Sequence, residues 1–196
     1  MKYFVLFFIM IFFSFTGLFS QEKSGNYYSQ LLGFKGGGEF FVYNFQSDWS
    51  MGVFFENVIS PLFGMEIEIV RSTIPVTNYS SDVGGVPINV TGNGKREYIE
   101  ISGAIKVYIK GVSICLGLTY NDFISGYIVE KSTSVYTPMS EQEINYFSVF
   151  FGPELTTQIS QDLFARVGLK GIYGFINVEP NYTFGIRFYI AFAYGI

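Results

Sequence analysis

The chain has 196 residues, of which 20% are aromatic and only 14% charged, and its formal net charge is −4 at pH 7. This balance is too apolar and aromatic for a disordered chain, and the charged fraction is well below the quarter that is usual in soluble domains. With no histidine and one cysteine, Cys115, the chain excludes histidine-based catalytic triads, intramolecular disulfides and cysteine clusters for zinc, and the weak negative charge gives nucleic-acid binding no electrostatic support.

The N-terminus has the pattern of a secretory signal peptide. Lys2 precedes an apolar run that ends at Phe13, and smaller residues then lead into a polar segment. We expect residues 1–20 to be a cleaved signal peptide, 21–30 a polar leader, and 31–196 a single barrel domain. An uncleaved N-terminal membrane anchor is the alternative. The rest of the chain has no run of about 18 consecutive apolar residues, which a membrane helix would need.

Apolar residues alternate with small or polar ones along most of the remaining chain, with the period of two that is typical of β-strands. In chain order this alternation predicts eight strands, over residues 32–43, 49–59, 63–75, 98–110, 112–121, 147–156, 163–175 and 182–196. The last is the clearest, because Phe184, Phe188 and Phe192 lie on one face and Arg187 and Ala191 on the other. It is longer than the ~9–11 residues that a tilted strand needs to cross a bilayer.

The connections between these strands alternate in length. Those after the second, fourth and sixth strands are short, and Lys110-Gly111 is expected to form a tight turn. Residues 76–94 and 129–143 are rich in turn-forming residues and are expected to be long loops, the first with a hairpin at its tip. Short periplasmic turns with longer outer loops are typical of bacterial outer-membrane barrels. Pro153 lies within a predicted strand, so we expect a bulge or irregularity near it.

Twelve charged residues of the predicted strands fall on the face opposite the apolar one. If the apolar faces point outward, six acids and six bases line the interior: Lys35, Glu39, Glu56, Glu66, Glu68, Glu100, Lys106, Lys110, Glu154, Arg166, Lys170 and Arg187. One such charge facing lipid would cost ~2–4 kcal/mol at the midplane, whereas a pair inside the barrel can be tolerated. We therefore predict an all-β, eight-stranded, antiparallel up-and-down transmembrane barrel, whose lumen is a cross-linked polar core and not an open pore.

A soluble barrel with the opposite orientation is the alternative. In a secreted lipocalin-like protein the apolar residues would point inward, bind an apolar ligand, and leave the charges in solvent. The abundance of Phe and Tyr favours the membrane barrel, because eight strands of aromatic residues would overfill a small interior but suit a lipid-facing surface.

Several segments carry a resemblance to a known family. They are Gly52-Val53-Phe54-Phe55-Glu56 with Ile59-Ser60, Phe63-Gly64-Met65-Glu66, Tyr98-Ile99-Glu100-Ile101 with Lys106-Val107-Tyr108, Leu116-Gly117-Leu118-Thr119-Tyr120, and the Phe-rich last strand. In their order the chain resembles the small outer-membrane β-barrel domain family that includes PorT-like proteins and lies near the OmpA/OmpX-type eight-stranded barrels. The chain departs from that pattern at Ile196, where such strands usually end in an aromatic residue. The resemblance implies a bacterial outer-membrane location.

Little in the chain points to catalysis. Glu66 and Glu68 share a face and could act as a carboxylate pair in glycoside hydrolysis, but they are better interpreted as ion-pair partners of Lys106, Arg166 or Lys170. The sequence thus favours a non-enzymatic outer-membrane protein without a cofactor or metal, monomeric, surrounded by lipid, which contributes to envelope structure or contacts a surface or host ligand through 76–94 and 129–143. A narrow channel or secretion accessory, suggested by the PorT-like resemblance, is a further alternative.

Overall fold

The computed structural model describes residues 30–41, 46–83, 86–109, 111–131, 135–139, 145–176 and 184–196. Within these ranges the strands are β1 (Gln30–Phe41), β2 (Gln46–Val58), β3 (Phe63–Val83), β4 (Val86–Ile109), β5 (Val112–Glu130), β6 (Tyr136–Pro138), β7 (Tyr146–Gln158), β8 (Leu163–Ile176) and β9 (Phe184–Gly195). No helix among the described residues is long and apolar enough to span a membrane. The predicted signal peptide and leader lie outside the described residues, except for Gln30.

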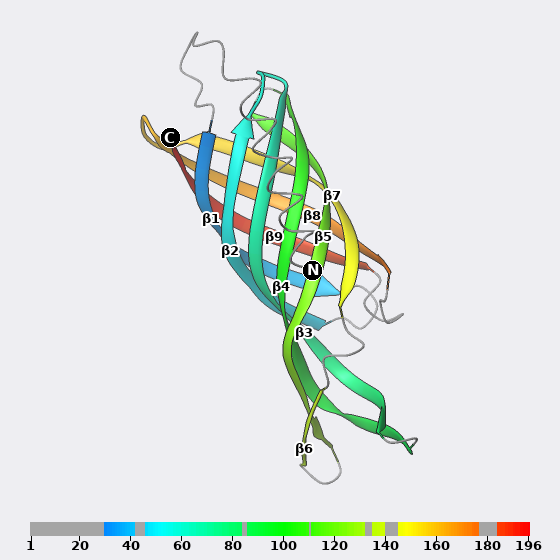
Figure 1. Cartoon of the computed structure of the whole chain (residues 1–196). Coiled ribbons are helices and arrows are strands. Elements are labelled where there is room, and N and C mark those ends of the chain that lie inside the picture. The colour runs from blue at the N-terminus through cyan, green and yellow to red at the C-terminus, as the bar shows by residue number, and fades with distance from the viewer. Residues whose placement is uncertain are drawn as a thin grey trace.

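Eight of these strands close into a barrel (Figure 1). Each pairs antiparallel with its neighbour in the chain, β7 follows β5 around the wall, and β9 returns to pair with β1 from Leu31↔Gly195 to Phe41↔Gly185. β6 stands outside this ring and pairs only with β5 among the described residues. The predicted eight-stranded antiparallel barrel is therefore confirmed.

Three tight connections gather at one end of the barrel, which we call the turn end. Two of them use the same arrangement, in which the backbone N–H groups of Ile59 and Ile159 donate to the carbonyls of Phe63 and Leu163. The third contains Gly111, whose φ of 86° favours glycine, as expected for a tight turn. The final residue also lies here, because the N–H of Ile196 donates to the carbonyl of Gln30.

At the opposite end, β3, β4 and β5 continue past the barrel wall as a sheet that we call the extension (Figure 1). Pairing of β2 with β3 ends at Ser50↔Ser72, whereas β3 stays paired with β4 as far as Val83↔Val86. Pairing of β4 with β5 reaches Gly92↔Glu130. The extension therefore consists of residues 73–83, 86–97 and 123–130, together with β6.

This extension corrects the prediction of two long loops. Within 76–94, all described residues belong to β3 or β4, and the predicted loop 129–143 begins inside β5 and contains β6. The prolines in these segments favoured loops over strands in the sequence analysis, because proline cannot donate a hydrogen bond to the ladder of a central strand. Among the described strands, Pro75 pairs only with β4 and Pro87 only with β3, and proline is tolerated at such edge positions.

The irregularity expected near Pro153 is a gap in the pairing of β7 with β8, which skips Gly152 and Pro153, and not a bulge. Pairs on either side of this proline, Phe151↔Gly171 and Glu154↔Gly168, keep the same register, and Pro153 lies directly opposite Ile114. The register of β7 against β8 shifts instead between Phe147 and Ser148. A missing N–H removes one donor without displacing the strand, because the remaining ladder on both sides fixes the register.

The two faces of the wall differ sharply. Every barrel strand exposes large apolar side chains on its outer face: Leu32, Phe34, Met51, Val53, Ile69, Ile105, Ile109, Leu116, Leu118, Phe151, Leu155, Val167, Leu169, Phe188, Ile190 and Phe192. On the inner face charged side chains are buried, with Arg166 only 3% and Glu100 4% exposed. The barrel is thus apolar outside and ionic inside.

Inward-facing glycines make room for inward-facing aromatic rings. Gly117 lies opposite Phe150 in the β5–β7 ladder, and a Cβ added at Gly117 would overlap the Phe150 ring. Gly168 has the same relation to Tyr189 across β8 and β9. A narrow barrel can hold such rings only where the neighbouring strand contributes no side chain of its own.

Candidate functional site

The structure gathers eleven of the twelve predicted lumen charges inside the barrel. All eleven side chains are buried, and they come from every barrel strand except β5. The twelfth, Lys110, lies outside the described residues. Alternation along each strand sends these residues to the same face, and closure of the sheet turns that face into a common interior.

Lys106 is the centre of the cluster nearest the turn end. Its ammonium Nζ lies 2.7 Å from Glu56, 2.6 Å from Glu66 and 2.5 Å from Glu154, and the Lys106 side chain has no exposed surface. Arg166 binds Glu56 with both of its terminal nitrogens, at 2.6 and 2.9 Å. Bidentate pairs of this kind are among the strongest hydrogen bonds in proteins. Five ionised side chains from five strands are thereby joined.

Lys35 connects this cluster to the middle of the barrel. Its Nζ lies 2.9 Å from Glu66 and also contacts Glu68, which in turn accepts a hydrogen bond of 2.7 Å from Lys170. Because Lys35, Glu66 and Glu68 each bind at least two partners, the network is continuous from Arg166 to Lys170. Removing one member would leave charge uncompensated at several others.

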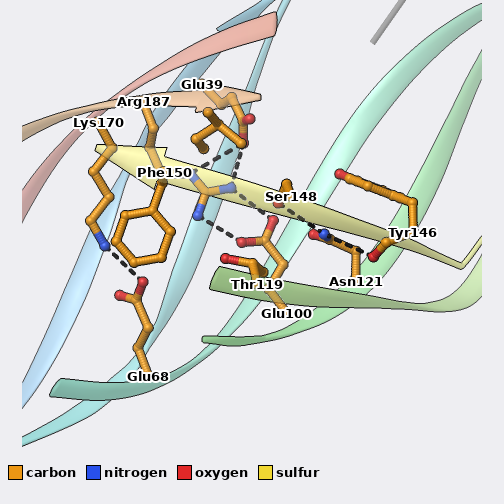
Figure 2. A pocket seen from close by; sticks show the side chains of 11 residues that line it. Glu39, Glu68, Glu100, Thr119, Asn121, Tyr146, Ser148, Phe150, Lys170 and Arg187 are labelled. Carbon is orange, nitrogen blue, oxygen red and sulfur yellow. Dashed lines mark hydrogen bonds and ion pairs between the residues drawn. The ribbon is translucent and has the colours of Figure 1, made fainter. Parts of the chain in front are cut away.

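A third group closes the lumen toward the extension. Arg187 makes a bidentate pair with Glu100, at 2.8 and 2.7 Å, and a further contact of 2.5 Å with Glu39. Figure 2 shows this group across from the Lys170–Glu68 pair, with the Phe150 ring close by. A cavity of about 10 Å³ remains between them, which is room for about one water molecule and far less than the ~300–1,000 Å³ of a usual ligand pocket.

Three aromatic side chains belong to the lumen, although the sequence analysis gave them no role. Lys35 Nζ lies 4.8 Å from the centre of the Phe54 ring, Lys170 Nζ lies 4.2 Å from that of Phe150, and both lysines lie near Tyr189. Cation–π attraction of this kind is worth more when both groups are desolvated. Tyr189 also donates its hydroxyl to Glu154. The available signal was their position on the charged face, each opposite or beside a glycine.

The lumen offers no free acid for chemistry among the described residues. Glu56, Glu66 and Glu154 converge closely enough to hold a metal ion, but the Lys106 ammonium already lies within hydrogen-bond distance of all three. Of the predicted carboxylate pair, Glu66 is bound by three cations and Glu68 by two. This arrangement suits mutual charge neutralisation. It does not suit general acid–base catalysis, which needs a carboxyl group within reach of a substrate.

The base of the extension has a small apolar core of its own. Ile74, Val76, Tyr98, Phe123, Ile128 and Met139 form one buried cluster. Met139 reaches it because its backbone N–H donates to the carbonyl of Gly126, which holds the segment after β6 against β5. A register shift beside Tyr98 turns the end of β5 so that Ile128 points into this cluster. The outer surface here is polar, as at the Arg71–Glu97 pair, where Arg71 is 52% exposed.

The chain matches no protein-family model and no curated protein sequence. Several solved structures are similar to it. One is Ail, the attachment invasion locus protein of Yersinia pestis, in complex with the heparin analogue sucrose octasulfate. The sequence identity is 9%, the alignment covers 85% of this chain and 96% of Ail, and the TM-score is 0.48.

For the N-terminal β-barrel domain of Pseudomonas aeruginosa OprF the identity is 10%, the coverage 85% of this chain and 97% of that domain, and the TM-score 0.43. For the outer membrane protein OprG from the same organism the identity is 10%, the coverage 86% of this chain and 95% of OprG, and the TM-score 0.44. Similarity this distant transfers no activity or ligand to this chain, and the resemblance to PorT-like proteins gains no support from these structures.

Proposed function

We propose that this protein is a non-enzymatic integral β-barrel of the bacterial outer membrane, and that it contacts partners at the cell surface through the extension. In this proposal the lumen charges are structural: they fill and cross-link the barrel. The short turns face the periplasm, and the extension projects outward from the cell. The N-terminal signal peptide directs its export.

One observation carries the membrane assignment, namely that apolar side chains are exposed on all eight barrel strands while charges are buried. Soluble monomers rarely expose a continuous apolar patch of more than ~300–600 Å², whereas a belt around the whole barrel requires a lipid environment. The same distribution argues against the lipocalin-like alternative, in which Ile105 and Leu116 would point inward. They are 57% and 59% exposed.

Membrane insertion is tested by two measurements on the same preparation. After expression with its native N-terminus, the protein should stay in the membrane pellet on carbonate extraction. It should also migrate faster on a denaturing gel before boiling than after, because folded membrane barrels resist detergent. Recovery in the carbonate supernatant without any heat-dependent shift would refute the membrane assignment.

The channel alternative is weakened by the continuous lumen network and by the small cavity. Planar bilayers should show no single-channel steps with the native protein. A Glu100→Gln plus Arg166→Gln variant removes one charge from the ion-pair group at each end of the lumen, and we expect it to remain non-conducting or to fail to fold. Regular steps from the native protein would make a channel the better assignment.

A further inference from the structure

One edge of the extension is left uncovered. Beyond Ser72, no described strand lies on the side of β3 that faces away from β4. The opposite edge is covered, because β6 pairs with β5 from Tyr127↔Pro138 to Val129↔Tyr136. Figure 1 shows the extension, with this edge of β3, projecting away from the barrel.

Only the outer part of this edge is suited to pairing with another strand. Close to the barrel, Pro75 has no backbone N–H group that could donate to an added strand. The register of β3 against β4 also shifts between Val76 and Asn78. Both features are ways in which proteins protect exposed edges. From Asn78 to Val83 the pairing with β4 is regular. At about 3.4 Å per residue this stretch is about 20 Å long, the length of an ordinary strand.

We infer that residues 78–83 pair antiparallel with the same residues of a second copy of this chain on an apposed membrane. A two-fold axis perpendicular to two identical edges makes them antiparallel, the arrangement with the better hydrogen-bond geometry. The edge suits itself electrically, because Asp82 is its one charged residue, and a pairing centred on Ser80 places Asp82 opposite Asn78 and not opposite the Asp82 of the second copy.

The geometry also excludes pairing between neighbours in one membrane. Copies in the same membrane are related by axes along the membrane normal, which would leave two outward-running β3 edges parallel. The antiparallel arrangement needs extensions that approach from opposite sides. The inference therefore rests on the proposed membrane location, with the extension facing outward.

A single contact of this kind is weak. Pairing of two six-residue edges is far smaller than the ~1,200–2,000 Å² of a standard stable interface. Two surfaces that carry many copies bind together through the sum of such contacts. The protein should therefore be monomeric in detergent, yet membranes that contain it should adhere to one another.

Proteoliposomes test this through light scattering. Vesicles with the native protein should scatter severalfold more light than empty vesicles as they cluster. The S80K/S81K and S80E/S81E variants should each stay dispersed, because like charges then face each other at the centre of the pairing. A mixture of the two vesicle populations should cluster again, since lysine then faces glutamate.

Three controls accompany the experiment. T91K/N93K adds the same two charges at exposed positions of β4 and should cluster like the native protein. Heat-dependent gel migration verifies that every variant is folded. A cysteine substituted for exposed Lys131 reports the outward-facing fraction with a membrane-impermeant maleimide, since Cys115 is buried.

The inference is overturned if folded, outward-facing native protein leaves vesicles dispersed, if S80K/S81K clusters as well as the native chain, or if the mixture fails to cluster. If vesicles with the native protein cluster only when a different protein is added, then that protein is the partner and not a second copy of this chain. This outcome also overturns the inference. Failure of the native chain to insert at all would be visible on the gel and would refute the proposed function separately.

Discussion

The barrel and the extension are built from the same strands, yet different forces hold them. In the barrel each strand has two neighbours, an outer face for lipid and an inner face crowded with ion pairs. In the extension, β3 has one strand neighbour among the described residues, and the packing reduces to one apolar cluster at the base. The change occurs at Ser72, where β2 stops pairing with β3. Buried ion pairs thus dominate where the sheet is closed, whereas the extension combines its apolar cluster with one buried charge among the described residues, Arg96.

The largest effect is expected at Lys106. Lys106→Met leaves Glu56, Glu66 and Glu154 converging without the cation that lies 2.5–2.7 Å from each. Breaking a buried ion pair costs ~3–5 kcal/mol, and three carboxylates are affected at once, so the variant should lose at least that much stability or fail to fold. Urea titration followed by heat-dependent gel migration measures the change.

The matched control for that variant is Lys95→Met, in the extension. Lys95 is 48% exposed and its single partner in the described residues, Asp48, is 7% exposed and lies 3.8 Å away. A single, long pair with an exposed lysine should contribute at most ~1 kcal/mol. Equal loss of stability in the two lysine variants would contradict the structural role of the lumen network.

An arginine on the outer wall comes next in size. Leu116→Arg places a charge on the lipid-facing side of β5 and should cost ~2–4 kcal/mol. Asn93→Arg adds the same side chain at an exposed position of the extension and should change stability by no more than ~0.5 kcal/mol. Unfolding in lipid vesicles compares the two. A neutral Leu116→Arg variant would mean that this face of β5 does not meet lipid.

A smaller effect is expected from the inward glycines. Gly117→Ala would push a methyl group into the Phe150 ring, and overpacking of this kind costs ~1–3 kcal/mol. Gly36→Ala is the control, because a Cβ there meets only the Ser50 carbonyl, at 3.8 Å. In a double-mutant cycle, Phe150→Leu should restore part of the stability lost in Gly117→Ala. Independent, additive effects would show that the ring and the glycine are not coupled.

The smallest effect is expected on the surface where β3 passes from the barrel into the extension. Arg71→Gln breaks a pair with Glu97 in which Arg71 is 52% exposed, so we expect a loss of ~0.2–1 kcal/mol that disappears at high salt. The same denaturant titration at low and high ionic strength checks it. A loss comparable to that of Lys106→Met would erase the contrast between the two regions.

The sequence by itself determined the barrel, because a period of two, repeated in Phe-rich strands such as 184–195, leaves one face apolar and the other charged whatever the neighbours are. It also placed eleven of the lumen charges on one face. It did not show which cation meets which anion, since Lys106 and Glu154 are brought together only by closure of the sheet.

The strands of the extension, likewise, became apparent only in the tertiary structure. Pro75 and Pro87 are typical of loops when only the chain is considered, and they fit into strands here because each pairs with a single neighbour among the described strands. The turn of Ile128 toward the apolar cluster depends on a register shift that no local pattern shows. Local alternation fixes the faces of a strand, but where a strand stops being a strand depends on whether a neighbour lies beside it to accept its hydrogen bonds.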